Sequence, residues 1–215
     1  MDLFASAADP HPSLEVIAEG AMLLRGFVGS LDAELIDALR DTVRQAPFRH
    51  MVTPGGYQMS VAMSNCGRAG WITDRTGYRY GTNDPETGKP WPAMPPLFCD
   101  LARRAAGCAG FGGFSPDVCL INRYVAGARL SLHQDRDELD FKAPIVSVSL
   151  GLPAIFLFGG LKRSDKVRRF RLEHGDVAAW GGPARLAYHG VAPLEDGEHS
   201  LLGRQRINLT FRKTR

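Results

Sequence analysis

Residues 130–137, with the sequence Leu-Ser-Leu-His-Gln-Asp-Arg-Asp, combine one imidazole with two carboxylates at alternating positions. Residues two apart share one face of an extended strand, so the alternation predicts that His133, Asp135 and Asp137 project to the same side. An inward-facing row of this kind costs free energy unless a cation or a polar ligand lies among the side chains. The stretch therefore predicts a metal site that takes at least one further ligand from elsewhere in the chain.

A second histidine, His189, could supply that ligand, because it closes a predicted strand over residues 185–189. Two histidines and one carboxylate leave three coordination positions of an iron open, an arrangement typical of non-haem Fe(II) oxygenases rather than of structural zinc. The alternative is that His189 is an ordinary hydrogen-bonded histidine beside a glycine turn.

A C-terminal strand over residues 206–212 carries a second set of polar side chains. Its polar positions share one face and its apolar positions the other: Arg206, Asn208, Thr210 and Arg212 against Ile207, Leu209 and Phe211. Guanidinium groups bind carboxylates bidentately, so an inward face with two arginines favours a dicarboxylate ligand. Asn122 and Tyr124, two apart on another predicted strand, could hydrogen-bond the same ligand. The alternative is a polar outer face on an edge strand.

The elements that must position these side chains are mainly strands. Eight short strands are predicted at residues 118–124, 129–134, 145–152, 154–158, 167–172, 176–180, 185–189 and 207–211. One predicted helix begins at an N-cap, Ser30, and ends before Pro47, and a second runs from Pro96 to about Cys108. The expected fold is α+β but mainly β: a double-stranded β-helix, or jelly roll, with the helices packed on one sheet.

Residues 51–92 differ from the rest of the chain because glycines punctuate a segment rich in tyrosine and tryptophan. One strand is predicted, at residues 58–65, and the remainder is expected to be a long loop or an array of hairpins. Residues 1–29 are predicted to be irregular apart from a short strand at 21–24. We expect a single domain over 1–215, made of an N-terminal extension and helix (1–50), a lid (51–92), and a second helix plus jelly-roll core (93–215).

Composition limits the cellular setting. A chain of 215 residues with 44% apolar content can bury one core, and no apolar run approaches the ~20 residues that cross a bilayer. The four cysteines lack paired spacing, so we expect reduced thiols and a cytoplasmic protein. The net charge is +3, but residues 161–171 hold six basic side chains and one acidic one, a local charge suited to phosphates.

Four motifs in chain order resemble the AlkB-type Fe(II) and 2-oxoglutarate-dependent dioxygenases that repair alkylated nucleic acids. They are residues 120–124 (Leu-Ile-Asn-Arg-Tyr), 131–135 (Ser-Leu-His-Gln-Asp), 188–190 (Tyr-His-Gly) and 206–212 (Arg-Ile-Asn-Leu-Thr-Phe-Arg). Residues 51–57 resemble the nucleotide-binding segment of the bacterial branch, so the resemblance covers nearly the whole chain. Val125-Ala126, where a proline is expected, and the basic Arg204 depart from the family pattern.

The resemblance implies roles for individual residues. It places iron on His133, Asp135 and His189, and 2-oxoglutarate on Asn122, Tyr124, Arg206, Asn208 and Arg212. It implies a base pocket of Trp71, Tyr78, Met63, Leu120, Asp137 and Arg163, with Thr53 and Tyr57 near the phosphates. Trp71 opposite His133 would stack on an extruded base, and Asp137 would favour bases made cationic by alkylation. The alternative for Asp137 is an ion pair with Arg136 or Arg129.

The implied activity is oxidative removal of alkyl groups from bases such as 1-methyladenine and 3-methylcytosine. It would consume 2-oxoglutarate and O2 and release formaldehyde, succinate and CO2. Single-stranded DNA is the expected substrate, RNA a further one, and a monomer the expected state. Two alternatives stay open: the same iron chemistry on a protein side chain or small molecule, and a non-enzymatic nucleic-acid binding module. The aromatic and basic segments argue against the first, and the second leaves Arg206 and Arg212 unexplained.

Overall fold

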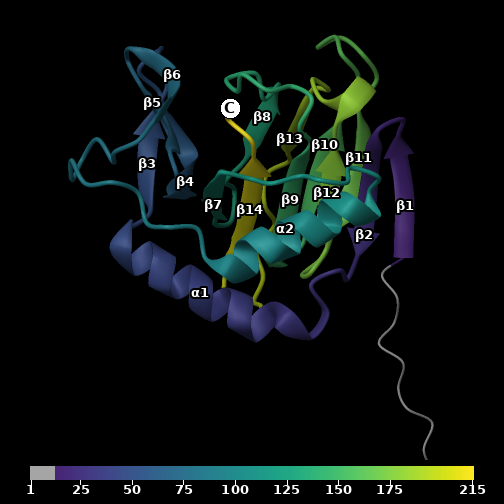
Figure 1. Cartoon of the computed structure of the whole chain (residues 1–215), viewed down its shortest axis with the longest axis horizontal. Coiled ribbons are helices and arrows are strands. Elements are labelled where there is room, and N and C mark those ends of the chain that lie inside the picture. Colours follow the sequence, from purple (N-terminus) through teal and green to yellow (C-terminus); the bar gives the residue numbers. More distant parts are fainter. Residues whose placement is uncertain (1–12) are drawn as a thin grey trace, which may run out of the picture.

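A computed structural model describes residues 13–215 as two facing β-sheets with two helices on the outside (Figure 1). The large sheet contains, in order, β1 (Ser13–Ala18), β2 (Ala21–Arg25), β12 (Val177–Trp180), β9 (Ile145–Gly151), β14 (Arg206–Arg212), β7 (Val118–Tyr124), β4 (Gln58–Gly67) and β3 (Arg49–Val52). The small sheet contains β11 (Arg168–Leu172), β10 (Ala154–Phe158), β13 (His189–Val191) and β8 (Leu130–His133). The predicted jelly roll, with its eight strands after residue 117, is confirmed.

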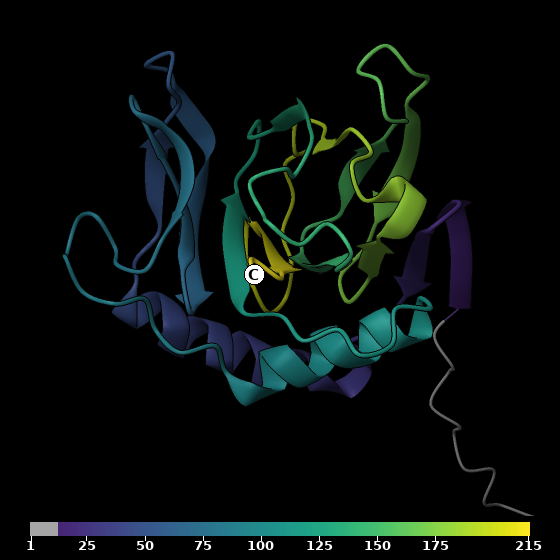
Figure 2. The ribbon, with the colours of Figure 1, turned by 45° about the horizontal axis from the view of Figure 1, so that its top comes forward.

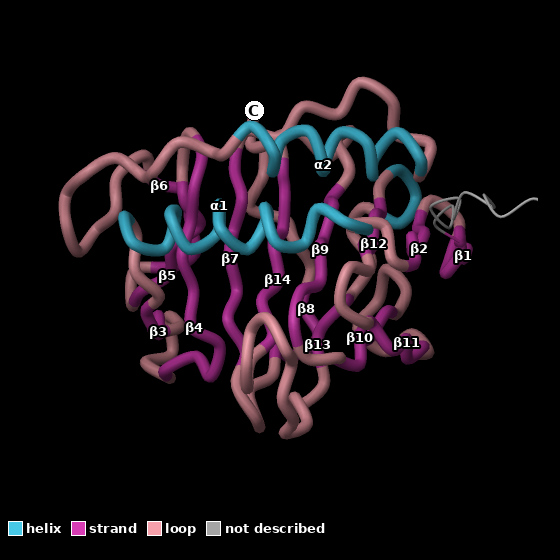
Figure 3. The backbone as a smooth tube through the Cα atoms, turned by 90° about the horizontal axis from the view of Figure 1, so that it is seen from below, coloured by secondary structure: helices cyan, strands magenta, loops and turns pink. Residues whose placement is uncertain are grey.

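Both helices pack on the outer face of the large sheet, as predicted (Figure 3). The apolar face of β14 supplies Ile207, Leu209 and Phe211 to this core, and the ring of Phe98 on α2 (Pro96–Cys108) meets Phe211 edge to face at 6.1 Å. Each such side chain contributes roughly 2 kcal/mol by leaving water. The opposite face of β14 is thereby turned toward the space between the sheets.

Three local predictions were wrong. Ser30 is not an N-cap, because it lies in a 3₁₀ turn (Gly29–Leu31) that precedes α1 (Asp32–Gln45). A strand, β1, forms in the stretch predicted to be irregular; its alternating Leu14 and Val16 are exposed, and the buried Ile17 follows Val16 directly, which breaks the alternation. The strand expected to end at His189 begins there instead, since Pro183 lies in a second 3₁₀ turn (Gly182–Ala184) and the chain becomes extended only at His189.

The segment predicted as a lid is built from hairpins. Strands β3 and β4 extend the large sheet beside β7, whereas β5 (Gly70–Asp74) and β6 (Gly77–Gly81) form a separate two-stranded sheet. This β5–β6 hairpin stands at the edge of the space between the sheets (Figure 2). Residues 1–12 of the predicted N-terminal extension lie outside the described residues. No helix within 13–215 has the length and apolar character needed to cross a membrane.

The turn before β12 holds a half-buried histidine that makes stability depend on pH. His174 Nδ1 accepts a hydrogen bond from the Gly151 amide at 2.9 Å, so its proton lies on Nε2, which is 3.5 Å from Asp32 Oδ2. The ring stacks on His199 at 4.4 Å. Burial, followed by the neighbouring His199, lowers the pKa of His174 from its ordinary 6.5. The folded protein therefore binds this proton more weakly than the unfolded chain does.

We expect the free energy of unfolding to fall as the pH drops below about 6.5, because protonation of His174 favours the unfolded chain. In urea titrations at pH 7.5 and 5.5, the wild type should lose more stability than His174→Gln, whose amide oxygen can still accept from Gly151. The histidines away from His174 and its neighbour His199 contribute equally to both proteins, so an equal loss in the two would contradict this prediction.

Candidate active site

A cavity of about 830 Å³ opens between the two sheets beneath the β5–β6 hairpin. All residues predicted to form the site line it. The polar face of β14 and the neighbouring residues of β7 form its floor, while β8 and β13 of the small sheet form the facing wall. The jelly roll thus gathers side chains that are far apart in the sequence into one cavity.

His133, Asp135 and His189 converge in this cavity, with one potential ligand atom from each residue lying within 4.8 Å of the others. The histidines are direct partners in the antiparallel pairing of β8 and β13. Asp135 Oδ1 lies 3.5 Å from His133 Nε2, and Asp135 Oδ2 lies 3.8 Å from His189 Nε2. Because metal–ligand bonds of about 2 Å separate neighbouring ligand atoms by about 3 Å, these spacings suit one ion.

All three side chains of the row predicted from the sequence line this cavity. The regular strand β8 ends at His133, however, and residues 134–138 belong to no strand. Asp135 is buried beside the histidines, whereas Asp137 is exposed and accepts a hydrogen bond from Trp71 Nε1 at 2.8 Å. The predicted row of three side chains therefore divides between two places in the cavity.

Backbone carbonyls determine which ring nitrogen carries the proton in both histidines. His133 Nδ1 lies 2.8 Å from the Ser131 carbonyl, and His189 Nδ1 lies 3.0 Å from the Ala187 carbonyl. A carbonyl can only accept, so each Nδ1 carries the proton and each Nε2 presents a lone pair to a metal. Burial, followed by the nearby His133, lowers the pKa of His189 to about 4, which keeps this imidazole neutral at pH 7.

Arg212 holds the carboxylate of Asp135. Its Nε and Nη2 both donate to Asp135 Oδ2, at 2.9 and 2.6 Å. Burial alone would raise the pKa of Asp135, but the charge of Arg212 and the contacts with His133 and His189 together outweigh burial and keep this pKa well below its usual range. These contacts differ from the open anion-binding guanidinium expected from the sequence. A contact between Arg212 and 2-oxoglutarate stays a prediction, since Arg212 lines the cavity.

Arg206 is buried in the cavity floor without an acidic partner among the described residues. Its side chain is 1% exposed, and Nη2 donates to Ser149 Oγ at 3.0 Å, while Nε and Nη1 have no hydrogen-bond partner among residues 13–215. The guanidinium lies over the Tyr124 ring, and its burial lowers the pKa of Arg206. An unpaired buried cation is costly, so this site fits a ligand carboxylate.

Two asparagines lie beside Arg206 in unequal roles. Asn122 Nδ2 donates to Asn208 Oδ1 at 3.2 Å, and Asn122 Oδ1 lacks a partner within the described chain. Asn208 is instead fully engaged, since it donates to Ser147 and Val148 and accepts from Thr210. Asn122 is therefore free to bind a ligand, while the contacts of Asn208 orient Asn122. Ligand binding by either residue stays a prediction.

Comparison with known proteins identifies this combination of groups. Residues 20–212 match the family model of the 2OG-Fe(II) oxygenase superfamily. The chain is 59% identical over 213 residues to the alpha-ketoglutarate-dependent dioxygenase AlkB of Escherichia coli (strain K12), a match that covers 99% of this chain and 97% of the relative. The chain is an AlkB-type 2OG-Fe(II) dioxygenase. Fe(II), 2-oxoglutarate and O2 are accordingly its cofactor and cosubstrates, and His133, Asp135 and His189 form a cluster whose ligand atoms suit a metal ion.

Two further proteins are similar over different extents. The structure of OsALKBH1 matches with a TM-score of 0.80 at 29% identity, covering 94% of this chain and all of that one. The nucleic acid dioxygenase ALKBH1 of Mus musculus is 34% identical over 135 residues, which cover 61% of this chain and 34% of the relative. The superfamily fold described above is therefore shared with a solved AlkB-like structure over nearly its whole length.

The mouth of the cavity in this dioxygenase is aromatic. The backbone of Trp71 exchanges two hydrogen bonds with the Asn65 side chain, at 2.9 and 3.1 Å, and its ring stacks on Tyr78 at 5.6 Å. Asp137 accepts the hydrogen bond of the indole, and among the described residues it forms neither of the alternative ion pairs, with Arg136 or with Arg129. Trp71 is therefore held at the cavity entrance by hydrogen bonds to its backbone and to its indole nitrogen.

The remaining predicted residues lie at two levels of the same cavity. Met63 and Leu120 are buried in its apolar wall, while Thr53 and Tyr57 lie at the outer rim, where Tyr57 is exposed. Arg163 Nη1 donates to the Leu132 carbonyl at 2.8 Å, which places one residue of the basic segment beside the metal cluster. The structure thus brings all the predicted base-pocket residues together.

Several residues near the His-Asp-His cluster were missed by sequence analysis. Ser149 is the side-chain partner of Arg206, and the ring of Trp180 lies 4.8 Å from His189. Glu138 and Arg185 are buried beside Asp135 and pair with each other at 3.1 Å. Glu138 follows the Asp-Arg-Asp run directly, so the sequence could have indicated it as a third acidic residue of the site. No sequence pattern indicates Ser149, Trp180 or Arg185.

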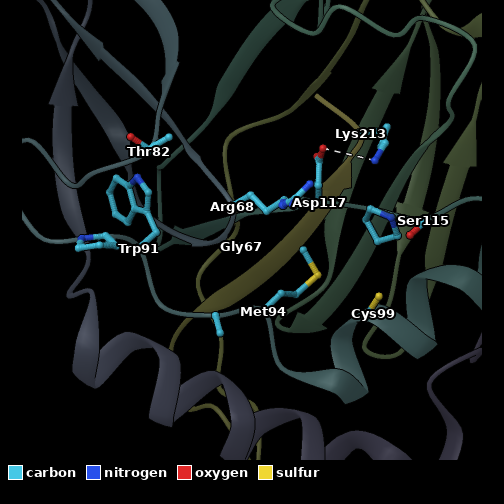
Figure 4. Close-up of a pocket in the computed structure, with 12 residues that line it drawn as sticks. Gly67, Arg68, Thr82, Trp91, Met94, Cys99, Ser115, Asp117 and Lys213 are labelled. Carbon is cyan, nitrogen blue, oxygen red and sulfur yellow. Dashed lines mark ion pairs between the residues drawn. The ribbon is translucent and has the colours of Figure 1, made fainter. Parts of the chain in front are cut away.

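A second hollow, of about 620 Å³, lies on the other side of β14, between the base of the hairpins and α2 (Figure 4). Lys213, which follows Arg212, lines this hollow instead of the metal cavity. The acidic group there, Asp117, already accepts hydrogen bonds from Thr214 and lies 3.6 Å from Lys213 Nζ. This hollow therefore has no open metal-binding cluster within the described residues.

Proposed function

We propose that this dioxygenase removes alkyl groups from the bases of nucleic acids by oxidation. The observation that carries the proposal is the composition of one cavity. Its interior holds a His-Asp-His cluster and an unpaired buried arginine, and its mouth holds an anchored tryptophan with a carboxylate at its edge. The interior suits iron and 2-oxoglutarate, and the mouth suits a flat base taken out of its stack.

In this proposal, His133, Asp135 and His189 hold the iron. Arg206 binds one carboxylate of 2-oxoglutarate, assisted by Asn122 and Tyr124. Iron, O2 and 2-oxoglutarate together supply the oxidation: one oxygen atom ends in succinate with loss of CO2, and the other reaches the alkyl carbon. The hydroxylated alkyl group then leaves the base nitrogen as formaldehyde when it derives from methyl. The chain contributes positioning of the reactants.

The base is held by the groups at the cavity mouth. Trp71 and the ring of His133 flank the place where a base would stack, and Asp137 lies at the edge of the indole. Alkylation at adenine N1 or cytosine N3 gives the base a positive charge, so a carboxylate favours damaged over normal bases. Thr53, Tyr57 and Arg163 at the rim are available for the flanking phosphates.

DNA is the proposed substrate, with single strands preferred, RNA also accepted, and the enzyme acting as a monomer in the cytoplasm. The mouse relative is named a nucleic acid dioxygenase, which supports nucleic acid as the class of substrate. The aromatic mouth can replace the stacking that a base loses on extrusion, and single strands cost least to open.

The deciding experiment measures formaldehyde and succinate from oligonucleotides carrying 1-methyladenine, 3-methylcytosine or no lesion, in single and double strands. Methylated oligonucleotides should yield both products in equal amounts, and unmethylated ones should yield little of either. Succinate formed without formaldehyde on every oligonucleotide would favour the alternative substrates, a protein side chain or a small molecule. Oligonucleotide binding without succinate would favour the non-enzymatic module.

Asp137→Asn should reduce the preference for methylated over unmethylated bases about tenfold. The reason is that one hydrogen bond to a charged group contributes about 1.5 kcal/mol, which corresponds to about a factor of ten. The asparagine oxygen can still accept from Trp71, so the indole should stay in place. Competition between methylated and unmethylated strands measures the preference, with Asp41→Asn on the exposed face of α1 as the control. An unchanged ratio would remove Asp137 from base selection.

A further inference from the structure

The β5–β6 hairpin is attached to the loop between β8 and β9 by two side-chain hydrogen bonds. One joins Trp71 to Asp137 at the cavity mouth. The other lies deeper: Tyr80 Oη donates to Glu138 Oε1 at 2.5 Å. Trp71 and Tyr80 are direct partners in the hairpin ladder, so the two bonds leave neighbouring points of the hairpin and end on neighbouring parts of one loop.

Glu138 belongs to a buried network behind the metal cluster. Its side chain is 1% exposed, and its Oε2 accepts from Arg185 Nη2 at 3.1 Å, while its Oε1 lies 3.4 Å from Arg212 Nε. Arg185 also donates to the backbone carbonyl of Asp135 at 2.7 Å. Two guanidinium groups and two carboxylates, those of Asp135 and Glu138, therefore balance in charge away from water. Removal of one member leaves a buried charge uncompensated.

Arg212 connects this network to the proposed iron ligand. Its Nε and Nη2 hold Asp135 Oδ2, and its Nη1 donates to Tyr80 Oη at 3.3 Å. Burial raises the pKa of Tyr80 far above its usual range, so the phenol stays protonated and donates to Glu138. Neither Tyr80 nor Glu138 lines the cavity, in contrast to Trp71, Asp137 and Arg212.

We propose that Tyr80 and Glu138 are positioning residues that act through Arg212 on the iron-binding carboxylate of Asp135. The hairpin that carries the base-stacking Trp71 also donates the phenol that completes the support of the metal ligand. Iron affinity should therefore depend on a hairpin residue that touches neither metal nor base. The inference rests on the proposed function for the role of Asp135 as an iron ligand.

The test uses Tyr80→Phe and Glu138→Gln in the full chain, with Fe(II) and 2-oxoglutarate added without oxygen or nucleic acid. Loss of a group that supports a metal ligand typically weakens metal affinity about 10- to 100-fold. We expect that range for Glu138→Gln and a several-fold loss for Tyr80→Phe, read from the Fe(II) dependence of the charge-transfer absorption. Arg79→Gln is the matched control, because it breaks an exposed ion pair with Asp74 in the same hairpin. Its Fe(II) affinity should equal that of the wild type.

The double variant separates this proposal from a general structural effect. If Tyr80 and Glu138 both act through Arg212, the loss of Fe(II) affinity in Tyr80→Phe/Glu138→Gln should be smaller than the product of the two single losses, and a loss equal to that product would contradict the shared route. Wild-type Fe(II) affinity in both single variants, with a raised KM for the oligonucleotide, would overturn the proposal. If Glu138→Gln fails to fold, Tyr80→Phe alone decides, since it removes a single oxygen atom. Absence of dealkylation by a wild type that binds Fe(II) would count against the proposed function instead.

Discussion

Replacing His133 with alanine should abolish formaldehyde and succinate production while leaving oligonucleotide binding largely intact. The substitution removes one of three ligands from the cluster, and loss of groups that merely support ligands already costs about 10- to 100-fold, so we expect a loss of at least about 100-fold. His133 is a better choice than Asp135. Its side chain is 34% exposed, whereas removing Asp135 would leave Arg212 buried without its main partner.

Fluorescence anisotropy with a methylated oligonucleotide gives the binding arm of this experiment. His199→Ala is the matched control, since His199 stacks on His174 and does not line the cavity. The control should keep its turnover. Turnover by His133→Ala after fresh Fe(II) is added would contradict the assignment of this cluster as the metal site. Loss of binding without loss of metal would show that His133 acts chiefly on the base.

The parts of the site that the sequence predicts are those that depend on strand periodicity. β14 alternates strictly, so its polar face and its helix-packed face follow from the residue types alone, and the structure confirms both. The same holds for Asn122 and Tyr124 on β7, whose residues pair with β14 in a single register. The alternation of side chains along a strand depends only on neighbouring residues, so it can be predicted without knowing the tertiary structure.

The contacts that sequence analysis missed depend on residues outside regular strands and on distant partners. Residues 134–138 follow β8 but belong to no strand, and there Asp135 lies beside the histidines while Asp137 accepts a hydrogen bond from Trp71. Arg212 reaches Asp135 across the fold rather than along a strand. Arg206 and Arg212 lie on the same face of β14, yet only Arg212 pairs with acidic side chains, those of Asp135 and Glu138. These acids lie far away in the sequence, so the difference between the two arginines is visible only in the tertiary structure.

Arg206→Met should weaken 2-oxoglutarate binding at least about 100-fold. Arg206 Nε and Nη1 lack partners within residues 13–215, and the site excludes water, so a ligand carboxylate would take up both donors. Two charge-assisted hydrogen bonds at roughly 1.5 kcal/mol each amount to about a factor of 100 in the dissociation constant. Calorimetric titration of the metal-loaded protein with 2-oxoglutarate measures the change directly.

Arg206→Met should also change the free energy of unfolding, and without ligand this change should be in the opposite direction to the loss of 2-oxoglutarate binding. Without 2-oxoglutarate the wild type carries a buried, unpaired guanidinium, so Arg206→Met should unfold with an equal or larger free energy. With 2-oxoglutarate at 100 times its dissociation constant, the wild type should gain about 2.7 kcal/mol and the variant almost nothing. Arg204→Gln is the control, because Arg204 forms an exposed pair with Asp196 and should keep the full gain. A variant that loses stability without ligand yet still gains it with ligand would mean that Arg206 is structural and that another cation binds 2-oxoglutarate.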